Sequence, residues 1–234
     1  MTRVLMHRKV SVEVPSAKVI DAVTENTYSG LEALEVLEEY LGPLEYTDKQ
    51  VESVALGSGK MMKIVFDRRS ITQTSESMLS EAARRGTLDG VYFLLQLDNT
   101  IVTRETLIAA AGNGNCGAEM LRLLWDRNPE IEPCIEMFME AAGCAESRTL
   151  RFLVDRLVDV KFVQQLLEAA TTGTSMRPHA RGILVESLLD STLPVQVTRK
   201  MAASVRTNHP GSFLWRVLAP YAMAMETSTE TADT

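Results

Sequence analysis

Residues 108–126 read IAAAGNGNCGAEMLRLLWD: an Ala-rich run, a break that contains glycine, and a Leu-rich run that ends in Asp. Two other stretches follow the same order, SEAARRGTLDGVYFLLQLD at 80–98 and MEAAGCAESRTLRFLVD at 139–155. Self-similarity at a regular spacing is the sequence signature of a repeat protein. The stretch therefore predicts one unit of a repeated helical hairpin.

The second small residue of each Ala-rich run sets the register of the repeat. Successive anchors are separated by 32, 28, 28, 31, 28 and 33 residues, at Val23, Ala55, Ala83, Ala111, Ala142, Ala170 and Ala203. This register predicts seven units within a single helical-repeat domain over 12–225, at 12–43, 44–70, 71–100, 101–130, 131–159, 160–192 and 193–225. Residues 1–11 form an N-terminal extension, and the polar, acidic residues 226–234 are predicted to be a disordered tail.

Start signals predict the first helix of several units. Thr47 and Gln50 match a capping box, and Thr103 precedes Arg-Glu in the same way. Pro133 and Pro194 stand where a first helical position tolerates a missing N–H. These units therefore have a helix start near their beginning, and each of the seven units has room for two helices.

Apolar spacing predicts the second helix. Leu150, Leu153, Val154 and Leu157 recur at i, i+3, i+4 and i+7, which places them on one buried face. A hairpin with one apolar face buries it by stacking on the next hairpin. The sequence thus predicts an all-α fold, an α-solenoid of about seven stacked helical hairpins in a right-handed ankyrin- or HEAT-like array, with the first and last hairpins as caps.

The stretch GNGNCG at 112–117 also fits G-x-G-x-x-G, the fingerprint of a dinucleotide-binding loop. Such a loop follows a β-strand, whereas this one lies between two predicted helices. We therefore interpret Gly112 as the residue that ends a helix in the left-handed conformation. The same offset in other units carries Gly57, Gly86 and Gly143.

The runs ITQTSESMLSEAARRG at 71–86 and VTRETLIAAAGNGNCGAEMLRLLWDRNPE at 102–130 resemble the helical repeats of filamentous-fungal proteins that occur beside NACHT or ankyrin modules in NLR-like receptors. The shared pattern is a Thr-led helix ending in AAAGN, a glycine, and a Leu-rich helix ending in Asp-Arg. The resemblance implies a repeat architecture and a role in protein interaction. It carries no catalytic residues.

Composition narrows the classes of function. The formal net charge of −7 and the pI near 5.1 argue against a broad nucleic-acid-binding surface. Three cysteines without a C-x-x-C fit neither a disulfide framework nor a zinc site, so we expect reduced thiols and no metal or other cofactor. No apolar run is long enough to cross a bilayer.

The N-terminal stretch MTRVLMHRKVSVEV lacks the continuous apolar run of a secretory signal, which predicts a cytoplasmic location. It carries a dense basic cluster: Arg3, His7, Arg8 and Lys9. Its alternating pattern is compatible with an extended segment that covers the first hairpin or pairs with a strand of a partner.

The least implausible reactive groups are His179, His209 and Arg177. The two histidines lie 30 residues apart in neighbouring inter-helix turns, so the repeat places these turns side by side. Converging imidazoles near an arginine could bind an anion or perform acid–base chemistry. Neither turn contains an Asp or Glu to orient a histidine, and exposed histidines without a special role are the simpler interpretation.

An Asp-Arg pair recurs near the end of three second helices. Adjacent helical residues do not face one another, but stacked repeats would align the pairs along one edge. We interpret the pairs as a solvated charge ladder or as a partner-binding strip made of Asp67, Arg68, Asp126, Arg127, Asp155 and Arg156.

Two further sets of residues receive structural interpretations. Glu35, Glu38 and Glu39 are expected on the solvated face of an amphipathic helix. Trp125 and Trp215 lie in second helices and are expected to pack in the core or between repeats, with an exposed binding hot spot as the alternative.

These patterns favour a non-catalytic protein–protein interaction scaffold or adaptor, because no catalytic motif accompanies the repeats. The alternative is a small-molecule-binding protein or a cofactor-independent enzyme with a pocket inside the helical array. The expected partner is a protein, with a small-molecule ligand possible and with no nucleic acid and no membrane involved.

Overall fold

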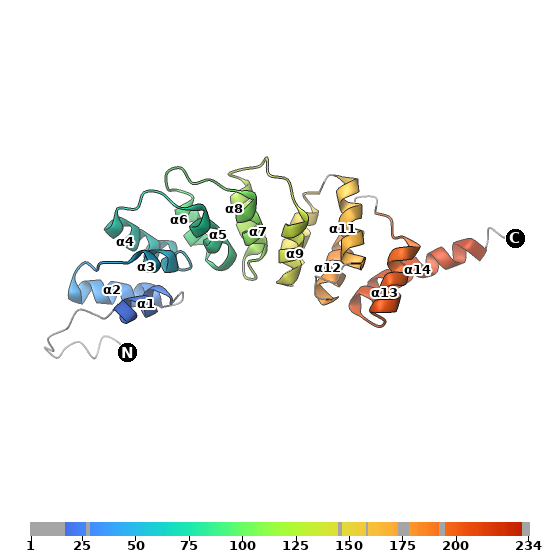
Figure 1. Ribbon diagram of the computed structural model, residues 1–234, viewed down its shortest axis with the longest axis horizontal. Helices are drawn as coiled ribbons and strands as arrows, with labels where there is room; N and C mark the ends of the chain where they lie inside the picture. Colours follow the sequence, from blue (N-terminus) through green and yellow to red (C-terminus); the bar gives the residue numbers. More distant parts are fainter. Residues whose placement is uncertain are drawn as a thin grey trace. The chain divides into compact units, whose positions relative to one another are not determined.

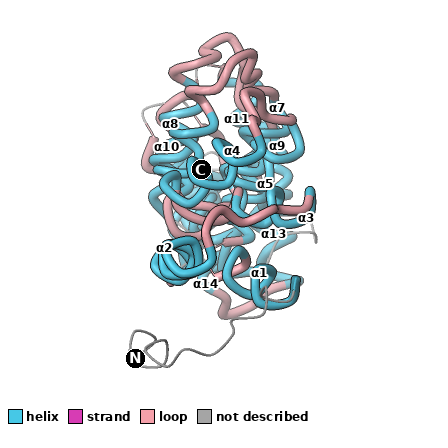
Figure 2. The backbone as a smooth tube through the Cα atoms, turned by 90° about the vertical axis from the view of Figure 1, so that its left-hand side faces the viewer, coloured by secondary structure: helices cyan, strands magenta, loops and turns pink. Residues whose placement is uncertain are grey.

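The computed structural model describes residues 17–26, 29–144, 147–157, 159–172, 178–191 and 195–230. Within these ranges the chain forms fourteen helices and no strand, apart from an isolated bridge between Gln73 and Asp98 (Figures 1 and 2). The prediction of an all-α chain is therefore confirmed for the described residues.

The chain divides into two compact units, Met1–Val102 and Thr103–Thr234. The N-terminal unit contains α1 (Ala17–Thr24), α2 (Gly30–Leu41), α3 (Asp48–Val54), α4 (Gly59–Arg69), α5 (Glu76–Arg85) and α6 (Leu88–Leu94). The C-terminal unit contains α7 (Arg104–Ala111), α8 (Gly117–Trp125), α9 (Ile135–Gly143), α10 (Ser147–Val154), α11 (Val160–Thr172), α12 (Pro178–Leu189), α13 (Arg199–Asn208) and α14 (Phe213–Glu230).

Two helices begin inside each of the seven segments that the sequence defines, and the units divide after Val102, two residues past the junction of the third and fourth segments. One boundary differs from the prediction. Helix α14 continues to Glu230, so 226–230 lie in a helix rather than in a disordered tail. The extension at 1–11, with Arg3, His7, Arg8 and Lys9, lies outside the described residues.

Within each unit, helices pack first in pairs and then against the next pair. In the N-terminal unit α1 packs on α2, α3 on α4 and α5 on α6, while α1 also contacts α3, and α4 contacts both α2 and α6. In the C-terminal unit the first helices join as α7 with α9 and α11 with α13, and the second helices join as α8 with α10, α10 with α12 and α12 with α14.

Within each unit, the core lies between the two helices of each hairpin and between successive hairpins. Leu150, Leu153, Val154 and Leu157 are all buried, as the apolar spacing predicts. Of the repeat anchors, those at 55, 83, 111, 142 and 170 are buried alanines. Val23 is only half-buried and Ala203 is exposed, so the anchor position is covered in the five inner hairpins alone.

Side-chain caps start many of the first helices. The capping box of Thr47 and Gln50 is present, and Thr103 accepts a hydrogen bond from the backbone N–H of Thr106. The expectation for Pro133 is wrong, because Cys134 is the N-cap of α9 and the proline precedes it. Pro194 lies outside the described residues.

The turn at 112–117 differs from the prediction. Gly112 has φ −80°, which is not left-handed, so the expectation for this glycine is wrong. The buried side chain of Asn113 closes the turn instead, because its Oδ1 accepts hydrogen bonds of 3.1 Å from the N–H groups of Asn115 and Cys116. A phosphate-binding loop would offer such N–H groups to its ligand. Here the Asn113 side chain occupies these N–H groups in place of a phosphate, which argues against the dinucleotide interpretation.

The glycines at the offset of Gly112 are not left-handed either. Several glycines at second helices instead allow close approach between hairpins. A Cβ on Gly59 would lie 2.6 Å from the backbone oxygen of Asp89, and one on Gly117 would lie 2.6 Å from Oγ1 of Thr149. Contacts this short are not tolerated, so the repeat uses glycine for packing rather than for backbone freedom.

Candidate functional site

The two histidines expected to converge have different partners. The ring of His179, in α12, packs against that of Phe213, with centroids 5.7 Å apart. His209 is the C-cap residue of α13 and contacts Arg181. Arg177 lies outside the described residues. The turn arrangement thus joins one histidine to an arginine, and no catalytic group of three is formed by the residues described there.

Arg181 is a buried cation at the junction of three helices. It is 2% exposed, and its Nε and Nη2 donate hydrogen bonds of 2.6 and 2.7 Å to the carbonyl oxygens of Ala170 and Thr171, near the end of α11. Its Nη1 donates to Nε2 of His209 at 2.8 Å. Burial lowers the pKa of Arg181. Each of its three nitrogens donates a hydrogen bond inside the protein, which gives this arginine a structural role.

The signal that could have identified Arg181 is its position in the sequence. Arg181, Leu184, Val185 and Leu188 follow the i, i+3, i+4, i+7 spacing, and all four are buried. The arginine therefore lies on the apolar face of α12, where a charge requires dedicated partners.

The Asp-Arg pairs lie at or just after the ends of second helices, and all six of their residues are exposed. In the N-terminal unit, Arg68 forms a bidentate contact with Glu38 of α2, with both N···O distances 3.3 Å. In the C-terminal unit, the guanidinium of Arg156 lies 4.8 Å from the ring centre of Trp125. In both contacts the arginine joins its hairpin to the preceding one.

The expectation of a fully solvated acidic face on α2 is wrong at Glu38. Its side chain is 15% exposed, and besides Arg68 it accepts a hydrogen bond of 3.1 Å from the hydroxyl of Tyr46. Burial, followed by the nearby Glu38 charge, raises the pKa of Tyr46 well above 10.0. Glu35 and Glu39 are exposed, as predicted.

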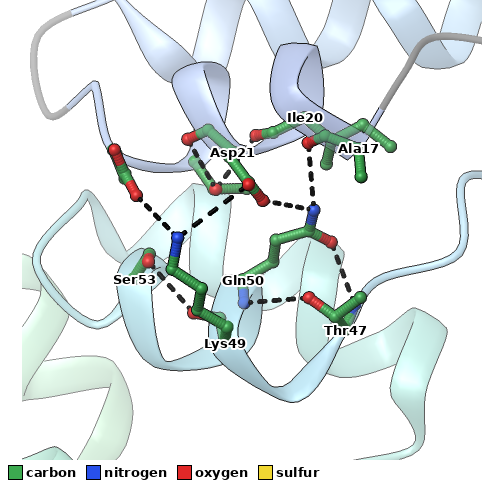
Figure 3. Close-up of polar contacts among 9 residues, drawn as sticks. Ala17, Ile20, Asp21, Thr47, Lys49, Gln50 and Ser53 are labelled. Carbon is green, nitrogen blue, oxygen red and sulfur yellow. Dashed lines mark hydrogen bonds and ion pairs between the residues drawn. The ribbon is translucent and has the colours of Figure 1, made fainter.

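The first two hairpins are held together by the polar cluster shown in Figure 3. Gln50 Nε2 donates hydrogen bonds to Asp21 Oδ1 at 2.7 Å and to the carbonyl oxygen of Ala17 at 3.4 Å. Lys49 Nζ lies 3.9 Å from Asp21 Oδ2 and 3.5 Å from a carboxylate oxygen of Glu25. One glutamine therefore caps α3 and joins it to α1.

An arginine–aromatic cluster covers the contact between α8 and α10. The ring of Phe152, on α10, has the guanidinium groups of Arg156 and Arg122 at 5.1 and 5.5 Å from its centre. Trp125 lies 6.0 Å from the same ring, is 1% exposed, and donates its indole N–H to the carbonyl oxygen of Ile131 at 2.7 Å. Packing in the core is thus confirmed for Trp125, which is buried where α8 meets α10, with an arginine layer outside it.

The thiols and acidic groups show no catalytic or metal-binding arrangement in the described ranges. The cysteines there form no disulfide, and burial raises the pKa of the Cys134 thiol, which disfavours a nucleophilic thiolate. Cys144 donates a hydrogen bond of 2.8 Å from its Sγ to the carbonyl oxygen of Gly112. No group of three or more His, Cys, Asp or Glu side chains within this part of the chain could hold a metal ion.

Two depressions lie in the last hairpins. One, of about 260 Å³, is lined by Arg199, Ala202, Ala203, Arg206, Thr207, Trp215 and Ala222. The other, of about 370 Å³, is lined by Glu186, Leu189, Asp190, Phe213, Arg216, Val217 and Tyr221. Neither contains His179 or His209, so the predicted histidines do not line these spaces.

Among the helices that the structure describes, none combines the length and apolar character needed to cross a bilayer. Comparison with known proteins found no matching family model, no matching curated protein and no matching solved structure.

Proposed function

We propose that this chain is a non-catalytic protein–protein interaction scaffold whose hairpins are the repeats of an α-solenoid. The observation that carries the proposal is the sequence separation of contacts between hairpins. Side-chain contacts at 28 to 32 residues recur in both units: Thr87 with Gly57, Asp89 with Gly59, Arg68 with Glu38, Gln164 with Gln196 and Arg181 with His209. This range matches the predicted repeat length.

A unit in which each hairpin contacts the next one builds its surface one hairpin at a time. Such surfaces serve recognition of large partners, because they present many side chains without requiring a deep cavity. The exposed anchor at Ala203 and the half-buried one at Val23 support the proposal that the first and last hairpins are caps. The resemblance of 102–130 to repeats of fungal NLR-like receptors, proposed from the sequence, points to the same kind of role.

The alternative of a small-molecule pocket has less support. Ligand pockets usually enclose about 300–1,000 Å³ and most of the ligand surface. The depression of about 260 Å³ lies at this lower limit, and the larger one brings together Glu186, Asp190 and Arg216 without a histidine. A repeat surface therefore remains the better proposal.

We also propose that the protein acts in a reducing compartment, the cytoplasm. Cys116, Cys134 and Cys144 form no disulfide and Cys144 is exposed, which supports this location, because an exposed thiol persists where disulfides do not form.

The test is affinity capture of the tagged chain from the cells that produce it, with crosslinking and mass spectrometry of the bound material. We expect a protein partner in near-equimolar amount, with crosslinks to several successive hairpins. A His179→Ala variant serves as the control and should retain the partner. Retention of a metabolite alone, or a turnover that His179→Ala abolishes without unfolding, would instead support the pocket alternative.

A further inference from the structure

Three arginines on or just after the second helices of the C-terminal unit are exposed and form no ion pair within the described residues. Arg122 lies on α8, Arg151 lies on α10, and Arg156 follows α10. Arg148, beside them, is engaged by Glu119 at 3.8 Å. We call Arg122, Arg151 and Arg156, together with the half-buried ring of Phe152, the arginine patch.

The guanidinium groups of Arg122 and Arg156 both lie within 5.5 Å of the centre of the Phe152 ring. Like charges near the same ring repel one another, and no carboxylate of the described chain lies between them as a partner. Stacking on aromatic rings restrains the planes of these groups and leaves their N–H edges available for hydrogen bonds. Restrained guanidinium groups of this kind suit bidentate recognition of carboxylates.

The neighbouring acidic residues form no ion pair with the patch. Glu119 is taken by Arg148; Asp126 is exposed one turn after Arg122, and Asp155 is exposed one turn after Arg151 and directly before Arg156. The positive charge of the patch is local, since the chain as a whole has a net charge of −7. A long nucleic acid would be repelled by such a chain, whereas a short acidic segment can reach the patch alone.

We propose that the arginine patch is the docking surface for an acidic peptide segment of the partner protein. Carboxylates of the segment accept hydrogen bonds from Arg122, Arg151 and Arg156, and an apolar side chain between them packs on Phe152. This proposal rests on the scaffold function and names the chemistry of its partner. It also gives Arg156, already singled out by the Asp-Arg pattern, a role in binding.

The probe is a fluorescein-labelled peptide in which pairs of glutamates alternate with leucine, compared with its glutamine counterpart by fluorescence anisotropy at low salt. We expect the glutamate peptide to bind, the glutamine peptide not to bind, and added salt to weaken binding. The test variant is Arg122→Gln/Arg151→Gln/Arg156→Gln, for which we expect at least a tenfold weaker Kd.

The matched control is Arg104→Gln/Lys161→Gln/Lys200→Gln, which removes the same charge from exposed positions on α7, α11 and α13. We expect its Kd to stay within twofold of the unmodified chain. Circular dichroism of both variants verifies that they are folded. A second variant, Arg122→Lys/Arg156→Lys, keeps the charge but loses the planar fork, and its Kd should lie between the other two.

Equal weakening in both charge variants would overturn the proposal, because it would show binding to the overall field. Absence of binding to the glutamate peptide would also overturn it, as would stronger binding of a phosphopeptide or single-stranded oligonucleotide of equal charge. The capture experiment distinguishes failure of the patch proposal from failure of the scaffold proposal. If the captured partner is retained by the patch variant, the scaffold stands and the patch proposal is wrong.

Discussion

Arg181 Nη1 donates a hydrogen bond of 2.8 Å to Nε2 of His209, and this contact joins α12 to the end of α13. Arginine has no acceptor, so Nε2 of His209 is the acceptor in this contact. The other donors of Arg181 bind two carbonyl oxygens at the end of α11. Helix ends leave such carbonyls without partners in the helix itself, so the arginine acts as an internal cap.

The Arg181→Met substitution tests this role. Methionine fills most of the volume but leaves the carbonyl oxygens of Ala170 and Thr171 and the His209 ring without their donor. We expect the free energy of unfolding to fall by about 1–3 kcal/mol, measured by urea unfolding of the C-terminal helices. The control is Arg127→Met, an exposed arginine, for which we expect a change below about 0.5 kcal/mol. Equal effects would contradict the assignment.

Tyr46 predicts a dependence on alkaline pH. Its pKa is raised in the folded state, so the folded chain holds the phenol proton above pH 10.0, where the unfolded chain releases it. Stability from this group is complete below pH 10.0 and falls as the pH rises further. Near pH 11 we expect a loss of about 1.4 kcal/mol relative to pH 9, measured by urea unfolding.

The Tyr46→Phe variant should lose this alkaline decline, because the titrating group is gone. Tyr92→Phe is the matched control, since Tyr92 is 56% exposed, and it should retain the decline. A decline of equal size in Tyr46→Phe would assign the effect to other groups.

Gln50 offers a nearly isosteric test of the contact between the first two hairpins. Gln50→Glu keeps the oxygen that accepts from the Thr47 backbone N–H but replaces the Nε2 donor, placing a carboxylate beside Asp21. We expect the free energy of unfolding of the N-terminal unit to fall by about 1–3 kcal/mol, measured by thermal or urea unfolding. Thr47→Ser keeps the capping hydroxyl and should change it little.

The sequence predicts the elements better than their polar partners. Periodic leucines such as Leu150 and Leu153, and caps such as Thr47, depend on residues within one helix, so local spacing reveals them. The role of Glu38 depends on Tyr46 and Arg68, which lie in the next hairpin. From its position in the helix alone, Glu38 is predicted to be exposed, and this prediction is wrong because the two partners cover it.

The candidate site shows the same division. Arg156 is marked by a repeated Asp-Arg pair, but its contact with Trp125 depends on how α10 packs beside α8. The position of Gly112 after a helix predicts a left-handed residue, but the turn is closed by hydrogen bonds to the Asn113 side chain. Both outcomes follow from contacts made only after folding.

Two glycines of the C-terminal unit test whether glycine is needed there for close packing or for backbone freedom. A Cβ on Gly117, the first residue of α8, would lie 2.6 Å from Oγ1 of the buried Thr149. Around Gly143, the last residue of α9, no atom lies within 4 Å of such a Cβ, and the residue is not left-handed.

We expect Gly117→Ala to lower the free energy of unfolding by about 1–3 kcal/mol. Gly143→Ala should stabilise by about 0.4–1 kcal/mol, because alanine restricts the unfolded chain. Urea unfolding measures the free energy of unfolding of both variants. If Gly143→Ala were destabilised and Gly117→Ala were not, the packing explanation would be wrong.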